Sequence, residues 1–205
     1  MIAKFRGGGQ ACTAANRFYV HASVADEFVA RLGGAIETLR VGPASDPTSQ
    51  VGPLVSARAA EGVRALIAQA TAEGAVIAHQ ASAPTDGWYV APTLLTGVRP
   101  DAAIVRQEIF GPVAPIVVWD NEDELLDWVN DTEYGLAAYI YTGRIQEALR
   151  IGESIDAGMV GINRGIVSDP SAPFGGTKQS GLGREGGRDG MHEFQETQYF
   201  SVDFE

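Results

Sequence analysis

The residue with the clearest capacity for chemistry is Cys12, the single cysteine of this 205-residue chain. The glycine run Gly7–Gly9 precedes it and lets the backbone turn tightly and approach a substrate closely. We expect Cys12 near the start of a short helical stretch, where free N–H groups and the helix dipole favour a thiolate. A thiolate attacks carbonyl carbon, and neighbouring N–H groups can hold the resulting oxyanion. The residues alone leave a buried structural cysteine as the alternative.

Four segments follow one another along the chain with motifs that resemble a single enzyme family. They are KFRGGGQACTAANR at Lys4–Arg17, QEIFGP at Gln107–Pro112, a stretch over Asn163–Lys178 that ends in PFGGTK, and SGLGREG at Ser180–Gly186. Together they resemble the aldehyde dehydrogenases, whose motifs read roughly F-x-N-x-G-Q-x-C, E-x-F-G-P and P-F-G-G-x-K-x-S-G-x-G-R-E. The resemblance covers the whole chain.

The resemblance implies a role for each matched residue. Cys12 matches the nucleophile that attacks the aldehyde to give a thiohemiacetal; hydride then passes to NAD or NADP, and water hydrolyses the resulting thioester. Glu108 matches the glutamate that hydrogen-bonds the nicotinamide ribose, and Phe110 matches the aromatic residue near the nicotinamide. Phe174 matches a residue that lines the substrate tunnel. Outside the motifs, Glu108 would be read as a solvated loop carboxylate and Phe174 as a core residue.

One branch of the family, the succinate-semialdehyde dehydrogenases, resembles this sequence most. In that branch an arginine six residues before the nucleophile and a serine six residues before the PFGG phenylalanine bind the substrate carboxylate. Arg6 and Ser168 stand at those positions. A guanidinium group grips a carboxylate through two hydrogen bonds, and unsubstituted alkyl aldehydes would leave Arg6 unpaired. Glutarate semialdehyde would satisfy the same pair, and a surface salt bridge is the alternative role for Arg6.

Three departures from the family pattern bear on function. Gly7 stands where the family often has asparagine, and we expect this to loosen the loop that holds Cys12. Ala14 stands where some members of the branch carry a second cysteine, so no disulfide switch is expected. Family chains are much longer. The resemblance therefore implies that the N-terminal cofactor-binding domain, the glutamate base and the oxyanion-hole asparagine are absent from this truncated chain, which we expect to be inactive alone.

Composition and charge narrow the classes of function. The net charge of −11 argues against nucleic acid or an anionic membrane as the main partner. One cysteine excludes an intrachain disulfide, and the three histidines lack metal-ligand spacing, so no metal is expected. No apolar run is long enough to cross a membrane, and the first residues lack a signal-peptide pattern. We therefore expect a cytoplasmic protein, and the resemblance implies that its partners are a small aldehyde with an ω-carboxylate and other copies of the chain.

The elements that must position these residues alternate between strand-like and helical patterns. Val113–Trp119 is a continuous apolar run, typical of a strand buried on both faces, and Asn121 can cap a helix over Glu122–Asn130. Spacings of three and four predict a helix over Val24–Leu39 with Ser23 as its N-cap. Further strands are predicted at Arg17–Val20, Ala75–Ala78, Gly135–Tyr141 and Met159–Ile162, and an extended segment broken by Pro92 is predicted over Gly87–Leu95. Further helices are predicted after Ser56, as N-cap, up to Gly74 and over Ile145–Ile155. This alternation predicts an α/β fold with a largely parallel twisted sheet and helices on both faces; the resemblance specifies the aldehyde dehydrogenase catalytic domain.

The chain is expected to have two parts, a catalytic domain over residues 1–190 and a C-terminal tail over residues 191–205. Phe194–Phe204 alternates loosely and predicts a terminal strand; in the family this segment pairs with a neighbouring subunit, which implies a homo-oligomer, either dimer or tetramer. Gly181–Gly186 fits G-x-G-x-x-G but does not follow a buried strand, so a tight turn is expected there. Two other functions stay open: an inert oligomerisation or interaction fragment, and a cofactor-independent thiol esterase that uses Cys12.

Overall fold

Four strands form the main sheet of the computed structural model, which describes residues 1–205. Their order across the sheet is β1-β4-β3-β2. The strands are β1 (Phe18–His21), β2 (Val76–Gln80), β3 (Thr93–Thr96) and β4 (Val113–Trp119). β4 runs parallel to both β1 and β3, and β2 joins the edge of β3 antiparallel. Phe18 lies opposite Ile116, and Leu94 lies opposite Ala114. The predicted, largely parallel sheet is confirmed.

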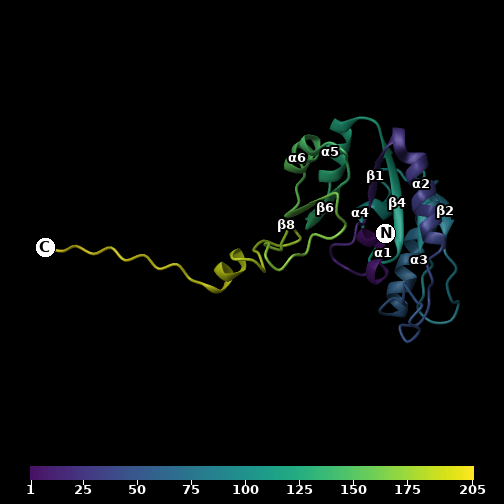
Figure 1. Cartoon of the computed structure of the whole chain (residues 1–205), viewed down its shortest axis with the longest axis horizontal. Coiled ribbons are helices and arrows are strands. Elements are labelled where there is room, and N and C mark those ends of the chain that lie inside the picture. The colour runs from purple at the N-terminus through teal and green to yellow at the C-terminus, as the bar shows by residue number, and fades with distance from the viewer.

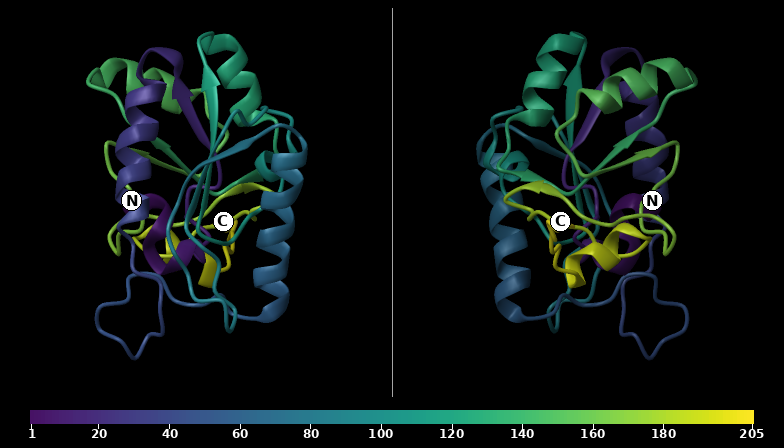
Figure 2. Two further views of the ribbon diagram at one scale, coloured as in Figure 1. Left: turned by 90° about the vertical axis from the view of Figure 1, so that its right-hand side faces the viewer. Right: turned by 90° about the vertical axis from the view of Figure 1, so that its left-hand side faces the viewer.

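Two hydrophobic cores lie on opposite faces of this sheet. Val113 and Val117 of β4 pack in one core with α3 (Ala57–Ala72), whereas Ala114 and Ile116 pack in the other with α2 (Ala22–Glu37). Because successive residues of a strand point to opposite faces, a strand covered on both faces needs apolar residues at every position. The views in Figure 2 show α2 and α3 on the two sides of the strands. The prediction of helices on both faces is therefore confirmed.

Two of the three predicted helix caps are confirmed. The Ser56 hydroxyl accepts a hydrogen bond from the Ala59 N–H at 3.2 Å, and the Asn121 side chain accepts from the first turn of α5 (Glu122–Asn130). The prediction of Ser23 as the N-cap of α2 is wrong. The helix begins at Ala22, and the cap is His21, whose Nδ1 accepts from the Ser23 N–H at 3.2 Å. An imidazole nitrogen can thus do what a hydroxyl or carboxylate oxygen usually does at this position.

A smaller group of elements lies beside the main sheet (Figure 1). β6 pairs in parallel with β7, and β5 pairs antiparallel with β8. The prediction of one strand over Gly135–Tyr141 is therefore wrong, because two short strands with different partners occupy that stretch. In chain order the elements are β5 (Tyr134–Gly135), β6 (Ala137–Ile140), α6 (Ile145–Glu153), β7 (Met159–Ile162) and β8 (Thr177–Lys178). The strand β7 has the predicted bounds, whereas β6 occupies only part of the stretch predicted as one strand.

The C-terminal residues leave the body of the molecule as an extended chain. The 3₁₀ helix η2 (Asp189–Phe194) is the last regular element, and Figure 1 shows the residues beyond it running away from the rest of the protein. The strand predicted at Phe194–Phe204 is not formed within a single chain, since its backbone groups have no neighbouring strand there. None of the helices combines the length and the apolar character that a membrane crossing requires.

Candidate active site

The glycine run lies at the start of the candidate site, between the short helix α1 (Ile2–Phe5) and Cys12. It belongs to the 3₁₀ segment η1 (Arg6–Gly9), and its three glycines have φ values of 60°, 67° and 76°. A Cβ atom at Gly9 would lie 2.3 Å from the carbonyl oxygen of Gly111, so a side chain cannot be accommodated there. The space around Gly7 is open instead. Asparagine tolerates this left-handed conformation, which agrees with its frequent occurrence at that position in the family.

Cys12 is exposed and lies in a turn. The Ala14 N–H donates to the Ala11 carbonyl at 2.9 Å and closes that turn. The prediction that Cys12 begins a helical stretch is therefore wrong, and no helix dipole supports its thiolate. The alternative of a buried structural cysteine is also excluded. Two contacts hold the turn in place: the Ala15 N–H donates to the Ala3 carbonyl at 2.8 Å, and the Tyr139 hydroxyl of β6 donates to the Thr13 carbonyl at 2.7 Å.

Glu108 and Phe110 lie on the segment between α4 (Ala103–Arg106) and β4, next to the glycine run. Both residues are exposed, Phe110 by 39%. Phe110 has a φ of 47°, which is rare for an aromatic residue. The contact of Gly9 with Gly111 brings this segment against the loop that leads to Cys12. Two segments that are far apart in the sequence, one leading to the predicted nucleophile and one carrying the two predicted cofactor contacts, therefore lie side by side.

Arg6 and Ser168 are both exposed, and no hydrogen bond joins them directly. Their segments do meet, because a Cβ at Gly165 would lie 3.1 Å from the Ala3 backbone nitrogen. Arg6 also lies near Tyr139: burial raises the pKa of Tyr139, while the Thr13 side chain and the positive charge of Arg6 oppose that rise. Arg6 forms no salt bridge with an acidic residue of this chain, so the alternative role of a surface salt bridge is not observed.

Phe174 is half-buried and is positioned separately from the residues around Cys12. Its N–H and carbonyl exchange hydrogen bonds with Glu185 at 2.7 and 2.8 Å, and no hydrogen bond links it to the nucleophile loop. Nearby Gly181, Gly183 and Gly186 have φ values of 97°, 87° and 72°. No α-helix follows them. This G-x-G-x-x-G sequence therefore does not open a helix as a dinucleotide-binding loop would, and Leu182 and Gly183 lie in a bend instead.

Lys4 is a residue near this site to which the sequence analysis gave no role. It is only 2% exposed, although lysine is almost never fully buried unless it is paired. Burial of the ammonium group lowers the pKa of Lys4 to about 7, and the negative charge of Glu108 opposes that shift. No pattern in the sequence could have revealed the burial of Lys4, because a lysine next to an apolar residue is also common on exposed helices.

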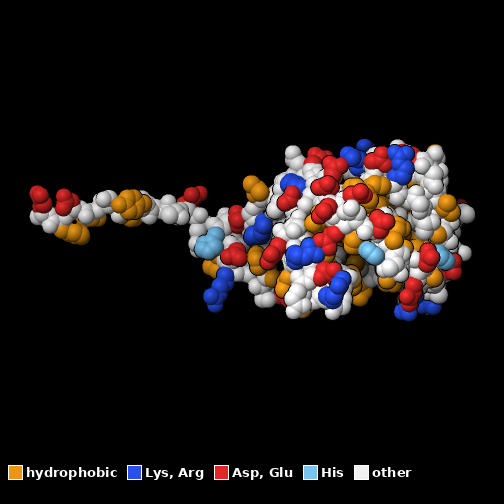
Figure 3. Space-filling view, turned by 90° about the horizontal axis from the view of Figure 1, so that it is seen from above, with side chains coloured by type: hydrophobic (Ala, Val, Ile, Leu, Met, Phe, Trp, Pro, Cys, Tyr) orange, Lys and Arg blue, Asp and Glu red, His pale blue; other side chains and the backbone are white.

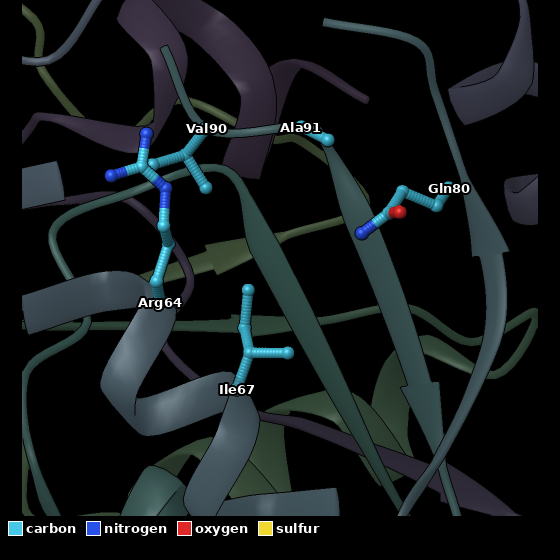
Figure 4. Close-up of a pocket in the computed structure, with 5 residues that line it drawn as sticks. All are labelled: Arg64, Ile67, Gln80, Val90 and Ala91. Carbon is cyan, nitrogen blue, oxygen red and sulfur yellow. The ribbon is translucent and has the colours of Figure 1, made fainter. Parts of the chain in front are cut away.

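Two cavities lie away from Cys12. One, of about 240 Å³, is lined by side chains of α3, of β2 and of the segment before β3 (Figure 4). These residues are Arg64, Ile67, Gln80, Val90 and Ala91. The other, of about 170 Å³, lies beside α4 and α5. Neither cavity includes a residue with a predicted functional role, so the candidate site is the surface around Cys12.

The chain combines an α/β fold with an exposed cysteine on a turn, and comparison with known proteins identifies its family. Residues 1–200 match the aldehyde dehydrogenase family. The chain is 49% identical over 204 residues to a succinate-semialdehyde dehydrogenase of Paenarthrobacter nicotinovorans, covering 98% of this chain and 45% of that protein. It is 39% identical to the NADP(+) succinate-semialdehyde dehydrogenase of Escherichia coli, covering 98% of this chain and 42% of that protein.

A solved structure agrees with this assignment. The crystal structure of succinate-semialdehyde dehydrogenase from Burkholderia pseudomallei matches with a TM-score of 0.90 and 42% sequence identity, covering 94% of this chain and 40% of that one. The chain therefore belongs to the aldehyde dehydrogenase family. It spans less than half the length of these relatives.

Proposed function

We propose that this chain is the nucleophile-bearing part of a dehydrogenase that oxidises an aldehyde to a carboxylic acid. The proposal is carried by the exposure of Cys12 on a turn, together with the close approach of Gly9 to Gly111, which brings the segment of Glu108 and Phe110 against the loop that leads to Cys12. The Cys12 thiolate adds to the aldehyde carbon, forming a C–S bond and a thiohemiacetal oxyanion. Removal of hydride from that carbon leaves a thioester, and water cleaves the C–S bond to release the acid and restore the thiol.

A nicotinamide cofactor, NAD or NADP, fits the residues on this face. The exposed carboxylate of Glu108 can accept hydrogen bonds from ribose hydroxyl groups, and Phe110 offers exposed aromatic surface for the nicotinamide ring. When bound, the cofactor supplies the acceptor for the hydride. The chain's own residues orient the ribose through Glu108 and limit the position of the ring through Phe110.

The substrate class that these residues favour is an aldehyde with a carboxylate at its other end, such as succinate semialdehyde. Arg6 is an exposed cation without an acidic partner in the chain, on a segment that meets the loop of Ser168. A free guanidinium group and a hydroxyl suit a carboxylate. The names of the relatives support the same choice, and Phe174 would line the path of the aliphatic chain.

The proposed activity can be tested by joining this chain to the part of a longer relative that this chain does not match. A chimera joins the portion of the Paenarthrobacter protein that precedes its match to this chain with residues 1–205. We expect it to oxidise succinate semialdehyde, followed by the absorbance of the reduced cofactor with NAD and NADP in turn, and we expect the chain alone to be inactive. A folded chimera without activity toward any aldehyde, beside an active Paenarthrobacter enzyme, would contradict the proposal.

Arg6→Met in this chimera is expected to raise KM for succinate semialdehyde by about 10- to 100-fold, because a charged, two-pronged hydrogen bond is lost. KM for butanal, which has the same chain length without the carboxylate, should stay within about twofold. Arg31→Met, on the exposed face of α2, is the control and should change neither value. Equal changes for both aldehydes would show that Arg6 does not recognise the carboxylate.

We also propose that the C-terminal tail binds a second copy of the chain, as is typical of family members. Phe194, Tyr199 and Phe204 are 92%, 85% and 91% exposed, and Figure 3 shows hydrophobic side chains along the projecting tail. An extended segment with unpaired backbone groups and exposed aromatic side chains readily adds to the strand edge of another molecule.

Deletion of residues 195–205 is expected to convert an oligomer into a monomer, because it removes these backbone groups and aromatic side chains together. Light scattering after size-exclusion chromatography measures the mass directly. The matched variant keeps the length and replaces Tyr199, Phe200 and Phe204 with serine, which should weaken association without abolishing backbone pairing. An unchanged mass after the deletion would contradict the proposal.

A further inference from the structure

One asparagine side chain joins the segment after Cys12 to the segment that carries Glu108. The Asn16 Nδ2 donates to the Gln107 carbonyl at 2.7 Å, and its Oδ1 accepts from the Ile109 N–H at 2.8 Å. The two bonds cross 91 and 93 positions of the chain and flank Glu108 on either side. They are the side-chain bonds that fix this segment to the nucleophile loop.

The pair of backbone groups selects an amide side chain at position 16. The Gln107 carbonyl can only accept a hydrogen bond, and the Ile109 N–H can only donate one. Asparagine has an acceptor and a donor in one plane, whereas aspartate lacks the donor and an apolar side chain lacks both. The orientation of the Asn16 amide is therefore determined by its partners.

The segment that Asn16 holds needs such support. Residues 107–112 belong to no helix or strand, and Phe110 has a φ of 47°, a conformation that costs energy in a residue other than glycine. Such backbone persists only where the surrounding contacts impose it. Two residues further along, Gly111 packs against Gly9. Asn16 and Gly9 thus hold the segment at two points, and both belong to the part of the chain that contains Cys12.

We propose that Asn16 is a positioning residue for the cofactor site, which fixes Glu108 and Phe110 relative to the Cys12 sulfur. It touches neither the aldehyde nor the cofactor; it acts through the backbone on both sides of Glu108. This inference rests on the proposed function, because the placement of Glu108 and Phe110 affects catalysis only when a nicotinamide cofactor binds there.

Asn130 provides a closely matched control elsewhere in the chain. Its Nδ2 donates to the Ser154 carbonyl at 2.8 Å, and its Oδ1 accepts from the Asp156 N–H at 2.9 Å. The geometry is the same as at Asn16: a carbonyl, and an N–H two residues later. Asn16→Ala and Asn130→Ala therefore remove the same two hydrogen bonds, one pair beside Glu108 and the other at the end of α6.

The first measurement is amide hydrogen exchange in the 205-residue chain, which needs no cofactor. Asn16→Ala is expected to speed exchange of the Ile109 amide by about tenfold or more, with the change confined to residues 107–112. Asn130→Ala should produce a similar change at residues 154–156 and none at residues 107–112. Unchanged exchange at Ile109, or faster exchange throughout the chain, would overturn the positioning role.

The second measurement is steady-state kinetics of the chimera described above. Asn16→Ala is expected to raise KM for the cofactor by about tenfold, while KM for the aldehyde and the rate of Cys12 alkylation stay within about twofold. Asn130→Ala should alter none of these. A fall in kcat with an unchanged cofactor KM would indicate a merely structural residue. If the parent chimera is inactive, the proposed function fails, and the exchange experiment still decides whether Asn16 holds the segment.

Discussion

Replacement of Cys12 with serine is expected to lower kcat of the chimeric dehydrogenase by at least about 1,000-fold. The proposed reaction begins when a thiolate adds to the aldehyde carbon. A serine hydroxyl ionises far less readily and would remain protonated at neutral pH. Because Cys12 is exposed in a turn, its replacement should leave the melting temperature nearly unchanged. Activity and stability should therefore separate cleanly in this variant.

The reactivity of Cys12 can also be measured directly on the 205-residue chain. With a single cysteine, the increase in intact mass after iodoacetamide at pH 7 reports only Cys12. Labelling faster than that of a free thiol, whose pKa is about 8.5, would show that the surrounding loop activates it. Cys12→Ala is the unreactive control. If Cys12→Ser retained more than about a tenth of kcat in the chimera, Cys12 would be excluded as the nucleophile. If the chain alone released a burst of product from an activated ester, and Cys12→Ala did not, the thiol-esterase alternative would be favoured.

The elements that the sequence predicts best are those with local causes. Val113–Trp119, Glu122–Asn130 and Met159–Ile162 have the same bounds in the structure as in the prediction. The first is apolar over Val113–Val117 because that part of the strand is covered on both faces, and the second begins at a strong cap, Asn121. Local pattern and tertiary environment agree at these positions, so sequence reasoning was sufficient.

The candidate site depends on contacts between segments that are distant in the sequence, and the sequence alone could not show these contacts. The motifs identify Cys12 and Glu108 individually, but the contact of Gly9 with Gly111 and the two bonds of Asn16 exist only after folding. The same reason explains the error at Cys12 itself, where tertiary contacts hold a turn in place of the expected helix. The strand predicted at Phe194–Phe204 is a further case, because no strand within the chain pairs with that segment.

Lys4 is the clearest example of a property that only burial creates, and its replacement has the second large effect that we expect. The pKa of Lys4 is about 7 in the folded protein and has an ordinary value of 10.5 when exposed to water. Between these values the unfolded chain binds more protons than the folded one, so this residue makes stability rise with pH. Below pH 7 both states are protonated, and the full cost of burying the charge lowers the free energy of unfolding.

Lys4→Met removes that cost while keeping an unbranched apolar side chain of similar length. We expect it to raise the free energy of unfolding by on the order of 5 kcal/mol at pH 6 and by only about 1 to 2 kcal/mol at pH 9.5, where the unfolded lysine has begun to lose its proton. Urea denaturation at the two pH values measures the difference. Lys178→Met, on a more exposed lysine that pairs with Asp156, is the control and should be mildly destabilising at both. Stabilisation of equal size at pH 6 and pH 9.5 would mean that improved packing, and not removal of a buried charge, accounts for the effect.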